Sequence, residues 1–201
     1  IIEPSAIAIQ AVNSTSACGI FAKSGDTYQL SQNVSSTSTC FSILAGNITL
    51  DCQGFKITYG SGGATGGIGI NNTGGYDNVT IKNCLIFDDS AGSTDNYGIR
   101  FLNVANSTIT TTTIFTITGN SHAIVLEGSD SNVISLTNIT TSVLGAYNPA
   151  YGILLNGTSN NNLLLNLNFS ISSQTGTRYS INNLDIGTIA VNTLIYNNSL
   201  G

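Results

Sequence analysis

The sequence predicts an all-β, single-domain parallel β-helix, or β-solenoid, of about six to seven coils. Three observations carry this prediction: a repeat of 25 to 31 residues, short apolar runs without helical periodicity, and polar corner residues between those runs. Periods of this length are typical of solenoids and related repeat folds. We expect residues 1–17 to form an N-terminal extended arm or cap and residues 18–201 to form the β-helix.

Six pairs of apolar anchors, five residues apart, mark the repeat. Their first members follow one another at spacings of 31, 28, 25, 30 and 25 residues. A small residue followed by Ile marks a second position in each of the first five repeats. The anchor pairs are Leu50/Phe55, Ile81/Ile86, Ile109/Ile114, Ile134/Ile139, Leu164/Phe169 and Ile189/Leu194, and the markers begin at Gly67, Gly98, Ala123, Gly152 and Ser180.

Each repeat contains short strands and no helix. The apolar runs are rich in Ile, Val, Thr and Phe and alternate with polar residues, as in Val79-Thr80-Ile81, which is typical of strands. Asn, Asp, Gly and Ser separate these runs and predict sharp corners. One coil cannot bury its inward side chains, but coils stacked about 4.7 to 4.9 Å apart pair their backbones and share a core.

Composition argues against several partners and locations. Only 7% of residues are charged, and five scattered Lys and Arg against ten acids give a net charge of -5, so nucleic acid binding is not expected. No apolar stretch approaches eighteen residues, so no membrane span is expected. Because few carboxylates need protonating, we expect the unfolding temperature to change little between neutral and acidic pH, which suits a protein that works in acid.

Four cysteines in the first 84 residues suggest two disulfides in a secreted protein. Three pairings are possible, and buried free thiols are an alternative. We favour Cys18 with Cys40, which closes the N-terminal segment, and Cys52 with Cys84, which follow equivalent anchors by two and three residues. The cysteines form no CxxC motif and have no neighbouring His, so neither a metal site nor a cofactor is expected.

Asn-x-Ser/Thr sequons suggest a secreted glycoprotein carrying covalent N-glycans, although a chain so rich in Asn, Ser and Thr also forms sequons by chance. The chain begins at Ile1 without Met, as expected after removal of a signal peptide. The ten sequons are at Asn13, Asn33, Asn47, Asn71, Asn78, Asn106, Asn138, Asn156, Asn168 and Asn197.

The segments 47–57, 78–86 and 97–101 resemble right-handed parallel β-helix repeat proteins, particularly secreted, cysteine-containing members common in archaeal surface proteomes. The segment Thr27–Val34 resembles their leader turn, and the resemblance covers residues 18 to 198. It implies a right-handed coil and an extracellular, cell-surface location. It specifies chemistry poorly, because the same coil carries carbohydrate-active enzymes, adhesins and components of surface layers or filaments.

Catalysis of carbohydrate chemistry on this fold would require a carboxylate cluster. The best local candidates, and weak ones, are Asp88, Asp89, Asp95 and Arg100, but a hydrophilic corner with solvated Asp is the favoured explanation. Arg100 is expected to point outward. His122, the only histidine, stands where a corner is expected, and we expect it to be a surface or packed residue rather than a general base. Five tyrosines are candidates for stacking on sugars: Tyr76, Tyr97, Tyr147, Tyr151 and Tyr179. Tyr97, Tyr151 and Tyr179 occupy similar positions in their repeats, which favours a structural ladder.

The two ends of the chain predict head-to-tail self-assembly, because residues 1 to 12 are apolar and no C-terminal cap is visible. Alternatives are that residues 1 to 12 cap their own molecule or that a downstream domain is missing. We therefore expect a non-catalytic structural subunit of a cell-surface filament or layer, with a glycan-binding adhesin or a polysaccharide lyase or hydrolase as alternatives. The expected assembly residues are Ile1, Ile2, Ile7, Ile9, Val191, Leu194 and Ile195.

Overall fold

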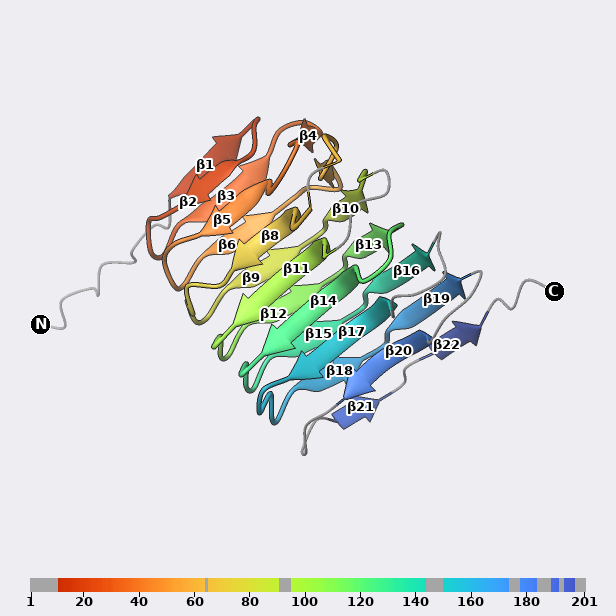
Figure 1. Cartoon of the computed structure of the whole chain (residues 1–201). Helices are drawn as coiled ribbons and strands as arrows, with labels where there is room; N and C mark the ends of the chain where they lie inside the picture. The colour runs from red at the N-terminus through yellow and green to blue at the C-terminus, as the bar shows by residue number, and fades with distance from the viewer. Residues whose placement is uncertain are drawn as a thin grey trace, which may run out of the picture.

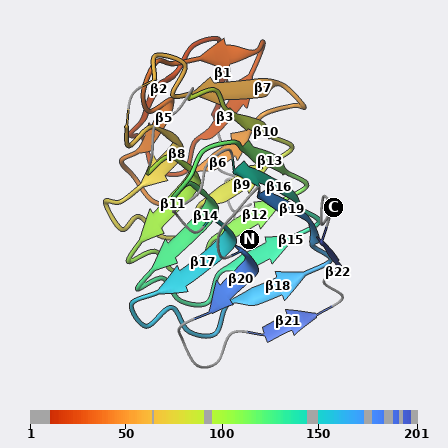
Figure 2. The same cartoon turned by 45° about the vertical axis from the view of Figure 1, so that its right-hand side comes forward.

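The chain forms a parallel β-solenoid built from three parallel sheets. The computed structural model describes residues 11–63, 65–90, 95–143, 150–173, 178–183, 189–191 and 194–197. Within these ranges each strand pairs in parallel with the equivalent strand of the neighbouring coil. The β1 and β22 ends of the stack lie at opposite ends of the molecule (Figure 1), and the three sheets surround a common interior (Figure 2). The predicted parallel solenoid is confirmed.

From β3 on, the chain passes through the three sheets in a fixed order, sheet A, then sheet C, then sheet B, whereas β1 of sheet A is followed directly by β2 of sheet B. Sheet A contains β1 (Val12–Thr15), β3 (Thr27–Leu30), β6 (Thr49–Asp51), β9 (Thr80–Lys82), β12 (Thr108–Thr110), β15 (Val133–Ser135), β18 (Leu163–Leu165) and β21 (Ile189–Val191). Sheet C contains β4 (Val34–Ser35), β7 (Lys56–Tyr59), β10 (Leu85–Asp88), β13 (Thr113–Thr116), β16 (Asn138–Val143), β19 (Asn168–Ser173) and β22 (Leu194–Asn197). Sheet B contains β2 (Gly19–Phe21), β5 (Phe41–Ile43), β8 (Ile68–Asn72), β11 (Tyr97–Leu102), β14 (His122–Glu127), β17 (Ala150–Asn156) and β20 (Arg178–Asn183).

The first anchors form a continuous column inside sheet A. The pairing aligns five of them, each no more than 1% exposed: Leu50, Ile81, Ile109, Ile134 and Leu164. Similar columns line the inner faces of sheets B and C, so apolar side chains fill the interior along the stack. Burial of each such side chain contributes roughly 1.5 to 3 kcal/mol, which makes the columns the main source of stability.

Three details of the predicted register are wrong. Ile57, and not Phe55, pairs with Ile86, because the corner after Leu50 is two residues longer and turns through positive φ at Gln53 and Gly54. In the last coil Ala190 and Ile195 pair with Leu164 and Phe169, one residue beyond the predicted anchors Ile189 and Leu194. The marker of the first repeat is Gly69-Ile70, two residues after the predicted Gly67-Ile68, since Ile70 pairs with Ile99.

Small residues occupy the marker column because the backbone bends inward there. A Cβ added at Gly98 would lie 2.5 Å from the Ala123 carbonyl oxygen and 2.6 Å from Ile114 Cγ2. At Gly152 it would lie 2.5 Å from the Ser180 carbonyl oxygen and 2.7 Å from the Phe169 ring. The marker therefore reflects a close approach between a coil, its neighbour and the opposite sheet.

Corner residues with positive φ stand three positions before the anchors on two sides of the coil. Asn and Ser are frequent there because their short polar side chains tolerate the left-handed region. Before the sheet A anchors they are Asn47, Asn78, Asn106, Ser131 and Asn161, and before the sheet C anchors they are Gly54, Asn83, Thr111, Leu136 and Asn166. These positions confirm the corners that the polar residues predicted.

A buried polar ladder, which the sequence analysis missed, runs along the corner between sheets B and A. The Val79 N–H donates to Ser107 Oγ, the Ser107 N–H to Asn132 Oδ1, and the Asn132 N–H to Asn162 Oδ1, each at 2.9 Å. Asn132 Nδ2 also donates to the Val104 carbonyl at 2.9 Å. Each side chain thus satisfies a backbone group of the preceding coil, as buried polar groups require.

Both favoured disulfides are present, and each joins two stacked coils. Cys18 bonds to Cys40 with a Cα–Cα distance of 4.7 Å, and Cys52 bonds to Cys84 with one of 4.8 Å. The alternative pairings and the free-thiol reading are excluded in this structure. Two disulfides indicate an oxidising environment.

Replacing Asn132 by Ala is expected to lower the free energy of unfolding by about 1 to 3 kcal/mol, because it leaves the Ser107 N–H buried without its partner. The Val104 carbonyl loses one bond and keeps the one from the Asp130 N–H. Urea unfolding of the non-glycosylated protein measures the change. Asn138→Ala is the matched control in the same coil, since Asn138 is exposed and is expected to cost less than about 0.5 kcal/mol. Equal effects of the two substitutions would contradict the ladder.

Candidate functional site

The four weak catalytic candidates take different positions in the structure. Asp88 ends β10 and is 4% exposed, whereas Asp89 is exposed. Asp95 is half-buried and accepts a hydrogen bond from Asn120, and Arg100 stands between buried Ile99 and Phe101 in β11. The expected outward orientation of Arg100 agrees with its half-buried side chain, but the acids do not form one cluster around it.

Asp88 is held by hydroxyl groups in the interior of the solenoid. The hydroxyl and the N–H of Ser90 both donate to Asp88 Oδ1, the latter at 3.1 Å, and Thr118 Oγ1 donates to Oδ2 at 3.0 Å. Asn96 Nδ2 donates to Ser90 Oγ at 2.6 Å. Tyr59 pairs with Asp88 in the ladder, and full burial together with the charge of Asp88 raises the Tyr59 pKa well above 10. These contacts tie three coils together and leave Asp88 closed off from solvent.

Arg100 forms an ion pair across two coils. Its Nε and Nη2 lie 2.9 and 2.7 Å from Glu127 Oε2, and its guanidinium carbon lies 5.3 Å from the centre of the Tyr97 ring. Both charged side chains are about 30% exposed, so the pair contributes modestly to stability. Arg100 is thereby occupied in holding neighbouring strands of sheet B.

His122 lies within an aromatic column, although the sequence analysis placed it at a corner. It begins β14, is 5% exposed, and has ring centres of Tyr97 and Tyr151 at 5.6 and 4.8 Å. Its Nδ1 accepts the Tyr151 N–H at 3.2 Å. Burial lowers the pKa of His122 from 6.5 to about 4, although the charge of Asp95 acts in the opposite direction. A neutral imidazole is therefore part of the fold.

The tyrosine ladder is confirmed where its residues are described. Tyr97 pairs with His122, and the backbone of Tyr151 pairs with that of Tyr179. Tyr76 packs against the core and bonds Asn72 through its backbone, and Tyr147 lies outside the described residues. The ladder thus has a structural role, with His122 as its unexpected member.

A second aromatic column stands on the outer face of sheet C, formed by Phe87 and Phe115. Their ring centres are 5.7 Å apart in a stacked arrangement, and Lys56 Nζ lies 5.5 Å from the centre of the Phe87 ring. Each Phe follows an anchor Ile directly, which is the signal that the sequence analysis overlooked. Because rings on neighbouring coils face one another along the stack, they present edges to solvent, whereas sugars stack on ring faces.

Seven sequon asparagines are exposed, and the coil geometry explains their pattern. In five of the seven, an Asn, a buried apolar residue and a Ser or Thr follow one another at a corner or strand edge, as in Asn47-Ile48-Thr49. The middle residue is the buried Ser107 after Asn106 and the exposed Gly157 after Asn156. Asn13 and Asn71 are half-buried, and the side chain of Asn197 lies outside the description. The exposed asparagines are Asn33, Asn47, Asn78, Asn106, Asn138, Asn156 and Asn168.

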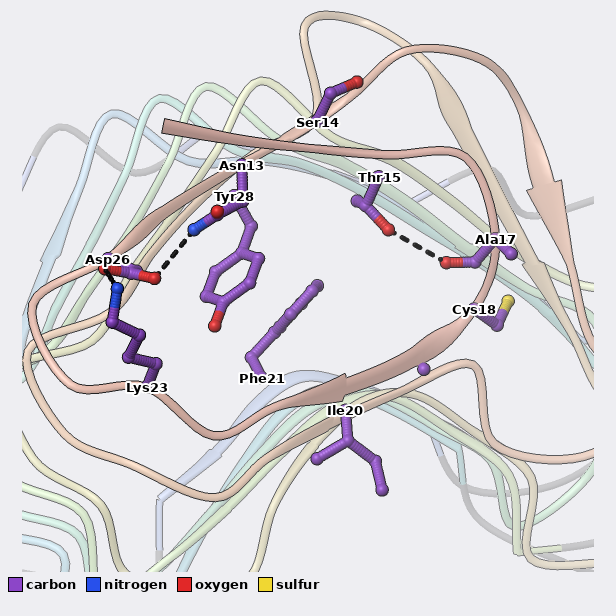
Figure 3. Close-up of a pocket in the computed structure, with 11 residues that line it drawn as sticks. Asn13, Ser14, Thr15, Ala17, Cys18, Ile20, Phe21, Lys23, Asp26 and Tyr28 are labelled. Carbon is purple, nitrogen blue, oxygen red and sulfur yellow. Dashed lines mark hydrogen bonds and ion pairs between the residues drawn. The ribbon is translucent and has the colours of Figure 1, made fainter. Parts of the chain in front are cut away.

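The N-terminal end of the stack is hollow. A cavity of about 470 Å³ opens beside β1 and β2, and the rings of Phe21 and Tyr28 lie 4.2 Å apart within it (Figure 3). Asp26 accepts a hydrogen bond from Asn13 at 2.7 Å and pairs with Lys23 at 3.3 Å at its side. At this end of the core Tyr28 is partly exposed, whereas Phe21 is already buried.

A second hollow, of about 390 Å³, lies at the corner between sheets A and C. It carries no ionisable side chain in a free state, because its only cysteine is in a disulfide. Its lining residues are Gln53, Gly54, Asn83, Cys84, Leu85 and Thr111. This hollow lacks a group suited to acid or base chemistry.

Four of the expected assembly residues, Ile1, Ile2, Ile7 and Ile9, lie outside the described residues. Val191 is in β21, and Leu194 and Ile195 are in β22, at the C-terminal edges of sheets A and C. Their backbones are described, but their side chains are not. Among the described residues no group of three or more His, Cys, Asp or Glu is placed to hold a metal ion.

Comparison with family models, curated proteins and solved structures found no match. Within the described ranges there is no helix with the length and apolar character needed to span a membrane. Fold and site geometry are therefore the basis for the function proposed below.

Stability is expected to fall by about 3 kcal/mol as the pH drops from 6.5 to 4, because the unfolded chain protonates His122 near 6.5 and the folded chain only near 4. This change opposes the flat acid profile that the low charge predicts. Urea unfolding at several pH values measures the slope, and His122→Phe should flatten it over this range. An unchanged slope in the variant would show that His122 is not its source.

Proposed function

We propose that this protein is a non-catalytic structural subunit that stacks end to end with copies of itself in an extracellular filament or layer at the cell surface. The observation that carries this proposal is the pair of complementary open ends. In the described residues β1, β2 and β4 are the N-terminal edges of the three sheets, and β20, β21 and β22 are the C-terminal edges. Since all strands are parallel, a second copy placed on either end continues the sheets in the same direction.

Among the described residues, the N-terminal edge has backbone groups that no neighbouring strand pairs. The carbonyls of Ala11 and Thr15 accept N–H groups of Thr27 and Ser31. Backbone groups of alternate residues in a strand point to opposite sides, so those of Val12 and Ser14 point away from β3. Strand addition at an open edge satisfies these groups and is an established mode of association.

The apolar character of this end supports the same contact. Tyr28, which is half-buried, lines the cavity beside Phe21 (Figure 3). Phe21 itself is only 2% exposed, since its ring packs against those of Tyr28 and Phe41. Head-to-tail contacts that do not close generate filaments. A second copy would cover the part of Tyr28 that remains exposed at this end.

The proposal also includes the handedness of the solenoid, the number of its coils, its N-glycans and its relatives. A right-handed winding is favoured because parallel crossover connections are right-handed in about 98% of cases. Six to seven coils, N-glycans on the exposed sequons and kinship with secreted archaeal surface proteins remain predictions. The closed environment of Asp88, the ion pair of Arg100 and the edge-on aromatic columns favour a structural role over an enzyme or a glycan-binding adhesin.

Ser14→Pro is expected to prevent end-to-end assembly, because it removes an N–H that faces away from β3 and breaks no bond to another described strand. Ser14→Ala keeps that N–H and is the matched control. Negative-stain microscopy and sedimentation of the purified chain distinguish rods from monomers. Wild-type protein that stays monomeric at all concentrations, or equal assembly of the two variants, would contradict the proposal.

A further inference from the structure

The side chains on the outer face of sheet A change from polar to apolar along the stack. Outward positions flank each inward anchor, and the pairing arranges them in two columns. One column runs Thr49, Thr80, Thr108, Val133 and Leu163, and the other runs Asp51, Lys82, Thr110, Ser135 and Leu165. Hydroxyls and the Lys82–Asp51 ion pair thus cover the N-terminal half, whereas apolar side chains appear toward the C-terminal end.

We define the apolar patch as Val133, Leu163 and Leu165, three half-buried side chains on neighbouring strands. The same columns continue into β21, where Ile189 pairs with Leu163 and Val191 pairs with Leu165. Adjacent apolar residues on the outer face of a sheet that is otherwise polar mark an interaction surface. The patch adjoins the end that receives a second copy in the proposed assembly.

The ten residues before Ala11 have the composition to cover this patch. They include Ile1, Ile2, Ile7 and Ile9, no Lys or Arg, and a single acid, Glu3. They lead directly into β1, the N-terminal edge of the same sheet A. We propose that residues 1–10 of one copy pack on the apolar patch of the preceding copy in the stack, an inference that rests on the proposed end-to-end assembly.

The length of residues 1–10 favours contact with the apolar patch of a neighbouring copy over contact with the patch of the same molecule. Within one molecule β18 is six strands from β1 in sheet A, about 29 Å at 4.8 Å per strand. Ten residues span about 33 Å only when fully extended, and this path would cross Asp51 and Lys82. In the stack β1 follows β21 of the preceding copy, so β18 is two strands away, about 10 Å. The intermolecular path is short and avoids the ionic half.

Engineered disulfides test which surface residues 1–10 contact. Ile9→Cys protein is mixed under mild oxidation with Leu163→Cys protein, and mass spectrometry identifies chains joined through positions 9 and 163. We expect this cross-link in the assembled fraction. Thr49→Cys, in the same column on the polar half, is the matched control partner and should yield little cross-link. Equal cross-linking to positions 49 and 163, or none to position 163, overturns the inference.

The double variant Ile9→Cys/Leu163→Cys, oxidised at a dilution where the chain is monomeric, tests self-capping. We expect no link within a chain, and a link there overturns the inference in favour of a self-cap.

A second measurement separates this inference from the proposed function. Removing residues 1–10, or substituting Leu163→Asn, should raise the concentration needed for half-assembly by roughly tenfold or more, the effect of losing a buried Leu contact. If wild-type chains assemble and both altered chains assemble equally well, the inference fails while end-to-end stacking stands. If wild-type chains do not assemble, the proposed function itself fails.

Discussion

The backbone hydrogen bonds between parallel coils, which set neighbouring strands about 4.8 Å apart, are the constraint on which the structure depends. They place each residue beside its equivalent in the next coil, so every side chain must suit a column. Apolar columns do this by packing, as Ile81, Ile109 and Ile134 show. Asn132 and Asn162 fit their column because each accepts a hydrogen bond from a backbone N–H of the preceding coil. Tyr97 and His122 fit theirs because their rings pack against each other.

The repeat made the fold predictable because anchor spacing directly reflects the length of a coil. The register failed at Phe55, where a corner with two positive-φ residues adds length that an apolar pattern does not reveal. The sequence analysis also missed Ser107 and Asn132. Polar residues near corners were expected at the surface, and sequence alone does not show a side chain turned inward toward a backbone partner.

The candidate site was harder to predict than the fold, since nearness in sequence is a poor guide at a corner. Asp88 and Arg100 are close along the chain, yet Asp88 turns into the interior and Arg100 lies on the outer face of sheet B. His122 was expected at a corner but begins a strand and is covered by two tyrosines. In each case the alternation of inward and outward positions, once the strand bounds are known, gives the environment of the side chain.

The placement of the two disulfides gives the chain an uneven response to mechanical force. Cys18–Cys40 and Cys52–Cys84 both lie in the first part of the stack, whereas the described coils beyond Cys84 are joined without covalent links. Tension applied to the C-terminal end would peel these coils off one at a time, since each contacts only its neighbours. The segment between Cys52 and Cys84, which are 32 positions apart, would not lengthen, because the disulfide carries the tension directly from one cysteine to the other. The molecule would thus lengthen in steps and still retain its disulfide-linked N-terminal coils.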